Sequence, residues 1–342
     1  MTKILSNKFS KKYLKNFFLT KMDANYQNDN LVYNFELKLK CKYHTGEIFC
    51  LIVLNDGRFA TCSMDKSIII YNQKTCKPDL IIKEDNYTVI DIMQLSSGML
   101  ASSSTDNTIK IFNIKNNNYK ILQTLNEHNT LAYYLIELNN KKLVSCSIGF
   151  SIIIYSKDNK DKYKKDQHIK LKKQIEGMNR CICVIETKDN VICYAELYDS
   201  ICFYDLLKRK VIKKINNIKS SKMKNSFNMI TNDLLLITGN EKLYIINVHQ
   251  HILVRIVNVP GSSMIYFSCV LNQNNILTGD CIHNIKQWRI EGNNLKLIST
   301  KNITHGKCMF QMIKLRDGHI LSGSIGDFGI KIWKYYLREY MI

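Results

Sequence analysis

Apolar and polar residues alternate along most of the chain in short runs that stop at turn residues. Residues 48–54 form one such run, which ends at the sequence Asn-Asp-Gly, and residues 309–315 form another, which ends at Arg-Asp-Gly. Alternation with a period of two, bounded by glycine, asparagine and aspartate, is typical of antiparallel β-strands joined by tight turns. Runs with the period and length of a helix are missing from residue 31 onward. The pattern therefore predicts an all-β fold.

The alternating runs belong to a unit that recurs seven times. Each unit contains a strand of small residues, a turn and an isoleucine-rich strand that closes on a large side chain, as in TCSMDKSIIIYN and SSSTDNTIKIFN. The closing residues are Tyr71, Phe112, Tyr155, Tyr204, Ile246, Trp288 and Trp333. Their successive spacings are 41, 43, 49, 42, 42 and 45 residues, and we interpret the stretch KDNKDKYKKD in the longest spacing as an inserted surface loop. A unit of about 40–45 residues with four strands is typical of one blade of a β-propeller.

The position nine residues before the closing residue is small in six of the seven units. The residues there are Cys62, Ser103, Cys146, Ala195, Ile237, Gly279 and Ser324. A strand near the axis of a tapering propeller has little room for side chains, which explains the limit on size.

The order and spacing of these residues resemble the WD-repeat propeller family over residues 31 to about 336. The resemblance implies that a tetrad of His, Ser or Thr, Asp and Trp holds each blade together. It assigns these structural roles to His44, Ser63, Asp65, Tyr71, Asp106, His305, Ser322, Asp327 and Trp333. The second blade lacks the histidine, and the third has His128 but Gly149 in place of the aspartate. Blades four to six carry Tyr198, Asn240 and Ile282 where the aspartate is expected.

The chain ends suggest how the propeller closes. Residues 31–40 alternate, precede the first blade and resemble the outer strand by which such rings complete the last blade, so that no open sheet edge remains. We therefore expect a seven-bladed β-propeller of four-stranded antiparallel blades at residues 31–336, preceded by a basic N-terminal extension at 1–30 and followed by a tail at 337–342. In the extension, Leu5, Phe9, Tyr13 and Phe17 are four residues apart, which is compatible with a helix carrying an aromatic stripe.

The net charge of +20 is concentrated in three segments. Residues 1–22, 157–173 and 207–224 carry +6, +5 and +8, and the last two belong to neighbouring blades. They predict a basic rim formed by Lys164, Lys165, Lys172, Lys173, Lys208, Arg209, Lys210, Lys213 and Lys214. Two interpretations stay open: a solvated surface enriched in lysine by an AT-rich genome, or a site for RNA, an acidic protein or a membrane surface. Since arginine is scarce, contacts to nucleic acid would be to phosphates rather than to bases.

The sequence has no recognisable catalytic or cofactor motif. It lacks G-x-S-x-G, a phosphate-binding loop, H-E-x-x-H and a dinucleotide fingerprint, so we predict no catalytic residue, no cofactor and no metal. His249 and His251 are a weak candidate metal pair. Cys181 and Cys183, with Cys193 and Cys202 on neighbouring strands, fit buried small hydrophobes better than a metal or redox cluster.

Cysteine usage and hydropathy bear on the compartment. The chain has 12 cysteines without a C-x-x-C pair, which favours free thiols in a reducing compartment over a disulfide framework. No apolar stretch approaches the roughly 20 residues of a transmembrane helix. We expect a cytoplasmic protein, with nucleus and mitochondrion as alternatives.

These observations favour a non-catalytic interaction scaffold or adaptor: a monomeric propeller within a hetero-complex, bound to other proteins. We expect partners on the face that carries the loops before each first strand and the aspartate turns. The exposed candidates there are Tyr43, Lys66, Tyr87, Phe150, Arg180, Tyr198 and Phe328. The alternative is a ribonucleoprotein- or ribosome-associated propeller that binds RNA phosphates or another anionic surface through the lysine-rich rim. Phosphoinositide binding ranks lower, because the Phe-Arg-Arg-Gly signature of such propellers is absent, and an enzyme is not favoured.

Overall fold

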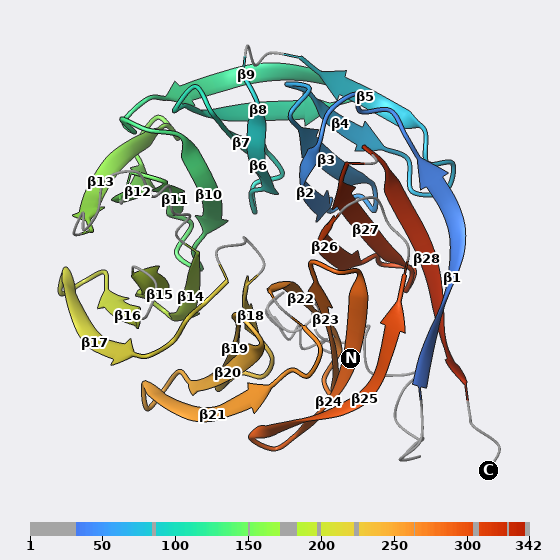
Figure 1. Cartoon of the computed structure of the whole chain (residues 1–342). Coiled ribbons are helices and arrows are strands. Elements are labelled where there is room, and N and C mark those ends of the chain that lie inside the picture. Colours follow the sequence, from blue (N-terminus) through green and yellow to red (C-terminus); the bar gives the residue numbers. More distant parts are fainter. Residues whose placement is uncertain are drawn as a thin grey trace, which may run out of the picture.

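In the computed structural model, the chain forms a closed ring of seven β-sheets (Figure 1). The structure describes residues 32–83, 87–149, 151–171, 183–196, 200–221, 226–262, 264–303, 308–326 and 328–338. In these residues it shows seven four-stranded antiparallel sheets and no α-helix, which confirms the predicted fold class. Accordingly, no helix in the described ranges has the length and apolarity needed to cross a membrane.

Each blade runs outward from the ring centre in the order of the sequence, except the last (Figure 1). Blade one contains β2 (Ile48–Val53), β3 (Phe59–Ser63), β4 (Ile68–Tyr71) and β5 (Pro78–Ile82). Blade two contains β6 (Val89–Gln94), β7 (Leu100–Ser104), β8 (Ile109–Lys115) and β9 (Asn118–Leu125). Blade three contains β10 (Ala132–Glu137), β11 (Leu143–Ser147), β12 (Ser151–Lys157) and β13 (Tyr163–Lys170).

The remaining blades repeat this arrangement. Blade four contains β14 (Val184–Lys188), β15 (Val191–Glu196), β16 (Ser200–Asp205) and β17 (Lys210–Asn216). Blade five contains β18 (Phe227–Met229), β19 (Leu234–Thr238), β20 (Lys242–Asn247) and β21 (Ile252–Asn258). Blade six contains β22 (Ile265–Asn272), β23 (Asn275–Asp280), β24 (Asn284–Glu291) and β25 (Asn294–Asn302). Blade seven contains β26 (Cys308–Lys314), β27 (Ile320–Ile325), β28 (Ile330–Arg338) and, from the other end of the chain, β1 (Val32–Cys41).

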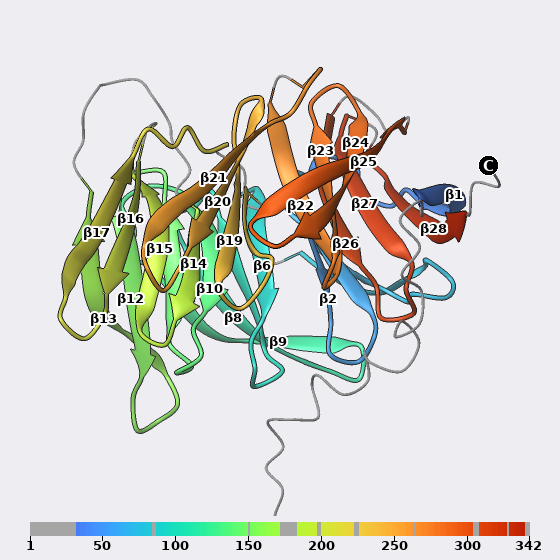
Figure 2. The ribbon, with the colours of Figure 1, turned by 90° about the horizontal axis from the view of Figure 1, so that it is seen from below.

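The core lies between neighbouring blades, because each sheet buries one face against the next. Second strands such as β3 and β7 are buried along their whole length, whereas the outer strand β17 is mostly exposed. The closing residue of the first unit, Tyr71, stacks on Phe59 with the ring centroids 4.8 Å apart. Tyr71 and Phe59 share a buried cluster with Leu315 and Leu321 of blade seven. Seen from the side, the blades form a thick disk (Figure 2).

The ring closes by pairing the two ends of the described chain. Strand β1 runs antiparallel to β28, with Val32 opposite Arg338 and Cys41 opposite Ile330. Gln311 in blade seven also joins this blade to blade one by two hydrogen bonds. Its side-chain amide donates to the carbonyl of Leu51 at 3.0 Å and accepts from the Leu51 N–H at 2.9 Å. Pairing of these two segments therefore closes the ring.

A disulfide joins the closing strand to blade one. It links Cys41 at the end of β1 to Cys76 in the turn before β5, with the Cα atoms 5.9 Å apart. Cys146, Cys193, Cys202 and Cys269 are free thiols. The expectation of free thiols throughout is therefore wrong for this pair. Pairing of β1 with β28 places Cys41 beside blade one, in the same buried cluster as Cys76.

Two boundaries and one loop differ from the sequence-based expectation. Strand β1 ends at Cys41 rather than at residue 40, and β28 continues to Arg338 rather than ending at 336. The stretch KDNKDKYKKD is not an inserted loop: it covers the end of β12, the hairpin turn and the start of β13. The helix expected at 1–30 lies outside the described residues.

Candidate interaction surfaces

One face of the ring is built by the segments before each first strand and the turns between the second and third strands. In blade one, His44 precedes β2 and Asp65 lies in the β3–β4 turn. The Nδ1 atom of His44 is 2.8 Å from Oδ2 of Asp65, and the backbone N–H of Thr45 donates to the same oxygen at 2.9 Å. The backbone N–H of Met64 also donates to the carbonyl of Glu47 at 2.7 Å. These bonds fix the loop and the turn to each other.

The hydroxyl partner of His44 is Thr61 rather than Ser63. The Nε2 atom of His44 lies 2.7 Å from Oγ1 of Thr61, and both side chains are buried. The Ser63 hydroxyl instead accepts the backbone N–H of Asp65 at 3.1 Å, inside the turn. Since strand residues alternate between faces, Thr61 and Ser63 lie on the same side of β3, and only the nearer one reaches the histidine. The signal that could have found it is position: Thr61 lies ten residues before Tyr71, as Ser145 does before Tyr155 and Thr278 before Trp288.

The carboxylate of Asp65 is held in its charged form. Burial would raise the pKa of Asp65, but hydrogen bonds from His44 and Ser67, the attraction of His44 and the Thr45 backbone together lower it well below its usual range. The Ser67 hydroxyl donates to Oδ1 at 2.6 Å. Asp65 is therefore a fixed structural acceptor rather than a group placed to exchange protons.

The other tetrad residues are found in partial copies of this network. Asp106 accepts from the backbone and hydroxyl of Thr108 at 2.9 and 2.7 Å, without a histidine bond among the described contacts. In blade seven, the indole N–H of Trp333 donates to the Ser322 hydroxyl at 2.7 Å. His305 and Asp327, predicted for the same blade, lie outside the described residues.

Blade three replaces the missing aspartate with serines. His128 is buried and places Nε2 2.6 Å from the Ser145 hydroxyl and Nδ1 3.2 Å from the Ser151 hydroxyl. Burial, aided by repulsion from His168, lowers the pKa of His128 to about 4. With two neutral hydroxyls and no carboxylate bonded to it, this histidine is neutral at neutral pH.

Blade six contains a buried ion pair that the sequence reasoning missed. Asp280, at the end of β23, accepts from the Ser262 hydroxyl at 2.7 Å and from the backbone N–H groups of Ile282 and Asn284. The ammonium of Lys286 donates to the Ser262 hydroxyl at 2.7 Å and lies 3.7 Å from the Asp280 carboxylate. The aspartate was expected at position 282, but it is two residues earlier in this turn. Ser262 precedes the first strand of its blade, as His44 does in blade one.

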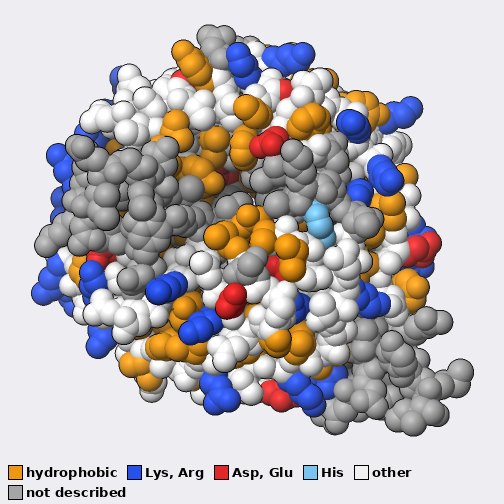
Figure 3. Space-filling view, viewed as in Figure 1, with side chains coloured by type: hydrophobic (Ala, Val, Ile, Leu, Met, Phe, Trp, Pro, Cys, Tyr) orange, Lys and Arg blue, Asp and Glu red, His pale blue; other side chains and the backbone are white. Residues whose placement is uncertain are grey.

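Large apolar side chains are exposed on this face around blades one, two and six. Tyr43 and Tyr87 are 47% and 56% exposed, and Met64 and Ile282, which the sequence analysis did not single out, are 55% and 50% exposed. On the face turned to the viewer, Figure 3 shows hydrophobic side chains near the ring centre and lysine and arginine side chains around the edge. Exposed aromatic residues and methionine are typical of protein interfaces.

Lys66 and Phe328, the other described candidates for this face, both have positive φ. Their φ values are 70° and 52°, and Lys66 is exposed while Phe328 is half-buried. A bulky residue in the left-handed region is uncommon and persists only where its surroundings enforce it. Phe150, Arg180 and Tyr198 lie outside the described residues.

The predicted basic rim is found on two outer strands and their turns, β13 and β17. All the described members are exposed: Lys164, Lys165, Lys208, Arg209, Lys210, Lys213 and Lys214. Four of them are partly neutralised, in the pairs Lys164–Asp158, Lys208–Asp205, Arg209–Asp166 and Lys214–Glu196. Among the described contacts, Lys165, Lys210 and Lys213 have no ion pair. Lys172 and Lys173 lie outside the described residues.

The candidate metal and redox residues do not converge. His249 pairs with Asp233 at 2.9 Å, whereas His251 packs against the ring of Phe203, with centroids 4.5 Å apart. No cluster of three or more His, Cys, Asp or Glu suited to a metal occurs in the part of the chain that the structure describes.

The described cysteines of blade four are buried, and two of them stay protonated. Cys183 and Cys193 are 2% and 0% exposed, and burial raises the pKa of Cys193 well above its usual value. Burial and the neighbouring Glu196 raise the pKa of Cys202 to about 12. Thiols that stay protonated are poor nucleophiles and poor metal ligands. Cys181 lies outside the described residues.

The first blade also carries the match to a known family. Residues 35–72 match the family model described as WD domain, G-beta repeat, and this segment includes His44, Thr61, Asp65 and Tyr71. The chain is a WD-repeat β-propeller. No curated protein matches its sequence. WD-repeat propellers are generally scaffolds for protein interaction and are typically not enzymes.

Proposed function

We propose that this WD-repeat propeller is a non-catalytic adaptor that binds partner proteins through the tetrad face, defined here by Tyr43, Met64, Lys66, Tyr87 and Ile282. It would act as a monomeric propeller within a larger hetero-complex. The observation that carries this proposal is the exposure of Tyr43 and Met64 on backbone that the Asp65 network and the bond to Glu47 hold in place. A backbone that is already fixed does not have to be ordered when a partner binds, which lowers the entropic cost of binding.

Affinity capture from cells with the intact chain tests this proposal. The double variant Tyr43→Ala/Tyr87→Ala truncates two exposed aromatic residues of the tetrad face. Tyr336→Ala is the matched control, because Tyr336 is 43% exposed on β28, in the outer part of blade seven. We expect the double variant to lose partners that the wild type and the control retain, with unchanged circular dichroism. Identical partner lists for all three folded proteins would refute the proposal.

A second candidate function is binding of RNA phosphates or another anionic surface by the basic rim. The observation that favours it is that Lys165, Lys210 and Lys213 are exposed, lie on outer strands of adjacent blades and have no ion pair among the described contacts. For single-stranded RNA, each phosphate contact adds about 0.7 to the slope of log affinity against log salt. The double variant Lys210→Glu/Lys213→Glu should weaken binding to labelled RNA and lower that slope by about 1.4. RNA binding with a slope near zero would count against this function.

We also propose that the protein works in the cytoplasm. The free thiols of Cys146, Cys193, Cys202 and Cys269 support a reducing compartment, and the buried position of Cys41 and Cys76 keeps their disulfide away from solvent. Fluorescence imaging of the tagged chain, with blotting for the disulfide in cell extract, is the test.

A further inference from the structure

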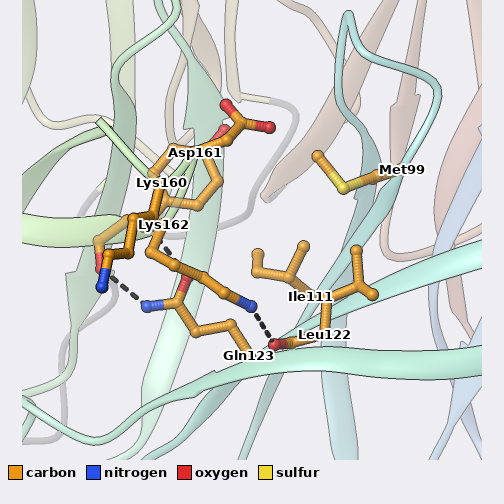
Figure 4. A pocket seen from close by; sticks show the side chains of 8 residues that line it. Met99, Ile111, Leu122, Gln123, Lys160, Asp161 and Lys162 are labelled. Atoms are coloured by element: carbon orange, nitrogen blue, oxygen red, sulfur yellow. Dashed lines mark hydrogen bonds between the residues drawn. The ribbon is translucent and has the colours of Figure 1, made fainter. Parts of the chain in front are cut away.

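A hollow lies between blades two and three, away from the tetrad face. Blade two contributes Met99, Ile111, Leu122 and Gln123, and blade three contributes residues 160–163 from the turn between β12 and β13 and the first residue of β13 (Figure 4). Its volume is about 170 Å³. Met99, Ile111 and Leu122 make one side apolar, and Lys160, Asp161 and Lys162 stand on the other side (Figure 4).

The walls of this interblade pocket are fixed by hydrogen bonds between the two blades. The Gln123 amide donates to the carbonyl of Tyr163 at 2.6 Å and accepts from the Tyr163 N–H at 2.9 Å. The ammonium of Lys162 donates to the carbonyl of Leu122 at 2.6 Å. Both strands are thus held at a set distance before any ligand arrives, and a pre-formed site costs less to occupy.

Size limits what the pocket can hold. Sites for small organic molecules and cofactors usually measure about 300–1,000 Å³. By contrast, a cavity of about 150 Å³ lined by apolar residues holds a single benzene. A pocket of about 170 Å³ therefore matches one apolar side chain rather than a whole cofactor.

The charges at the mouth of the pocket indicate which residues should flank the apolar side chain of a ligand. Lys160 is exposed and has no ion pair among the described contacts, and the Lys162 side chain donates to a neutral carbonyl rather than to an acid. The one acid of the mouth, Asp161, is neutralised by Lys157 at 2.7 Å. The surface that a ligand would meet is positive, so acidic residues complement it.

We propose that the interblade pocket binds one apolar side chain of an acidic, extended peptide segment in a partner protein. This proposal rests on the proposed adaptor function, and it adds a second contact point with its own sequence preference. Apolar burial would supply affinity and the lysines would select acidic flanking residues. An RNA has no side chain to place between Met99 and Leu122, so the pocket favours a peptide.

Selection from a random peptide library displayed on phage tests this proposal with the intact chain as bait. The variant Leu122→Phe fills the pocket. Ile298→Phe is the matched control, because Ile298 occupies the same bulged position of β25 in blade six that Leu122 occupies in β9. We expect the wild type and Ile298→Phe to enrich peptides in which Asp and Glu flank one Leu, Met or Phe, and Leu122→Phe to lose that enrichment. Equal melting temperatures of the three proteins show that folding is unchanged.

The best enriched peptide then separates the two parts of the site by fluorescence polarisation. Replacing its apolar residue by Ala should reduce affinity about tenfold or more, since burial of a large apolar side chain has that effect. Lys160→Glu should weaken binding more than Lys208→Glu, which reverses an exposed lysine on the corresponding turn of blade four.

Three results would overturn the proposal: no enrichment of acidic peptides with an apolar residue, the same enrichment by Leu122→Phe, or equal affinity for the Ala peptide. If these occur while Tyr43→Ala/Tyr87→Ala still loses cellular partners, the pocket proposal alone fails. If that double variant also retains every partner, the proposed tetrad-face function fails as well.

Discussion

Buried His128 should make the folded ring sensitive to mild acid. Its pKa is lowered from 6.5 to about 4, because the imidazole is 4% exposed and bonds only to the hydroxyls of Ser145 and Ser151. Between these two pH values the unfolded chain binds a proton at this position and the folded chain does not. The stabilisation is therefore complete above pH 6.5 and is lost as the pH falls toward 4.

The size of this effect follows from the pKa shift. At pH 5, the unfolded state gains about 2 kcal/mol from protonation of His128, and the loss levels off at about 3 kcal/mol below pH 4. Asp65 does not change the free energy of unfolding in this pH window. Its pKa is lowered in the folded protein, so the stability it provides is lost only when the pH falls through the ordinary range of a carboxyl group and below it. His168 and His251, whose pKa values are also lowered by partial burial, are present in both wild type and variant, so their contributions largely cancel in the comparison.

Urea unfolding at pH 7 and pH 5, followed by tryptophan fluorescence, measures this effect. The variant His128→Asn removes the titrating group, and it should lose about 2 kcal/mol less than the wild type on acidification. The variant will be less stable at pH 7, so the comparison rests on the change with pH and not on the absolute free energy. An equal loss in wild type and His128→Asn would refute the claim that this histidine is buried in its neutral form.

Three further variants test other contacts. Thr61→Val leaves the buried histidine of blade one without its hydroxyl partner and should reduce the free energy of unfolding by about 1–3 kcal/mol, whereas Ser63→Ala should cost less; chemical denaturation compares them. Cys76→Ser opens the disulfide and should cost about 3–4 kcal/mol in non-reducing urea titrations, an effect that dithiothreitol should reproduce in the wild type. Gly279→Ala would place a Cβ 2.1 Å from the ring of Phe267, so its melting temperature should fall by several degrees, corresponding to about 1–3 kcal/mol.

The blade count could be predicted from the sequence because each blade repeats one local pattern. The recurring closing residue and the small residue nine positions earlier reflect packing inside a single unit. The structure supports the size limit at Gly279, where the ring of Phe267 occupies the space of a Cβ. Periodicity of this kind survives even where the polar tetrad has decayed.

Contacts that the repeat does not encode were harder to predict. The Cys41–Cys76 disulfide depends on how the first strand packs beside blade one, which no local spacing encodes. The buried Lys286–Asp280 pair was missed because its turn shifts the aspartate by two residues, and a lysine in a strand is ordinarily read as exposed. The interblade pocket joins residues about 40 positions apart through Gln123 and Tyr163, so it became visible only in three dimensions.

Hydrogen exchange of the intact chain, read by mass spectrometry, tests the closed ring most directly. The account predicts that backbone amides of β1, Val32–Cys41, exchange as slowly as those of the other outer strands β5 and β9, because β1 is hydrogen-bonded to β28. Exchange of the β1 amides at the rate of an unstructured peptide, while β28 stays protected by its pairing with β27, would show an open last blade and contradict the account.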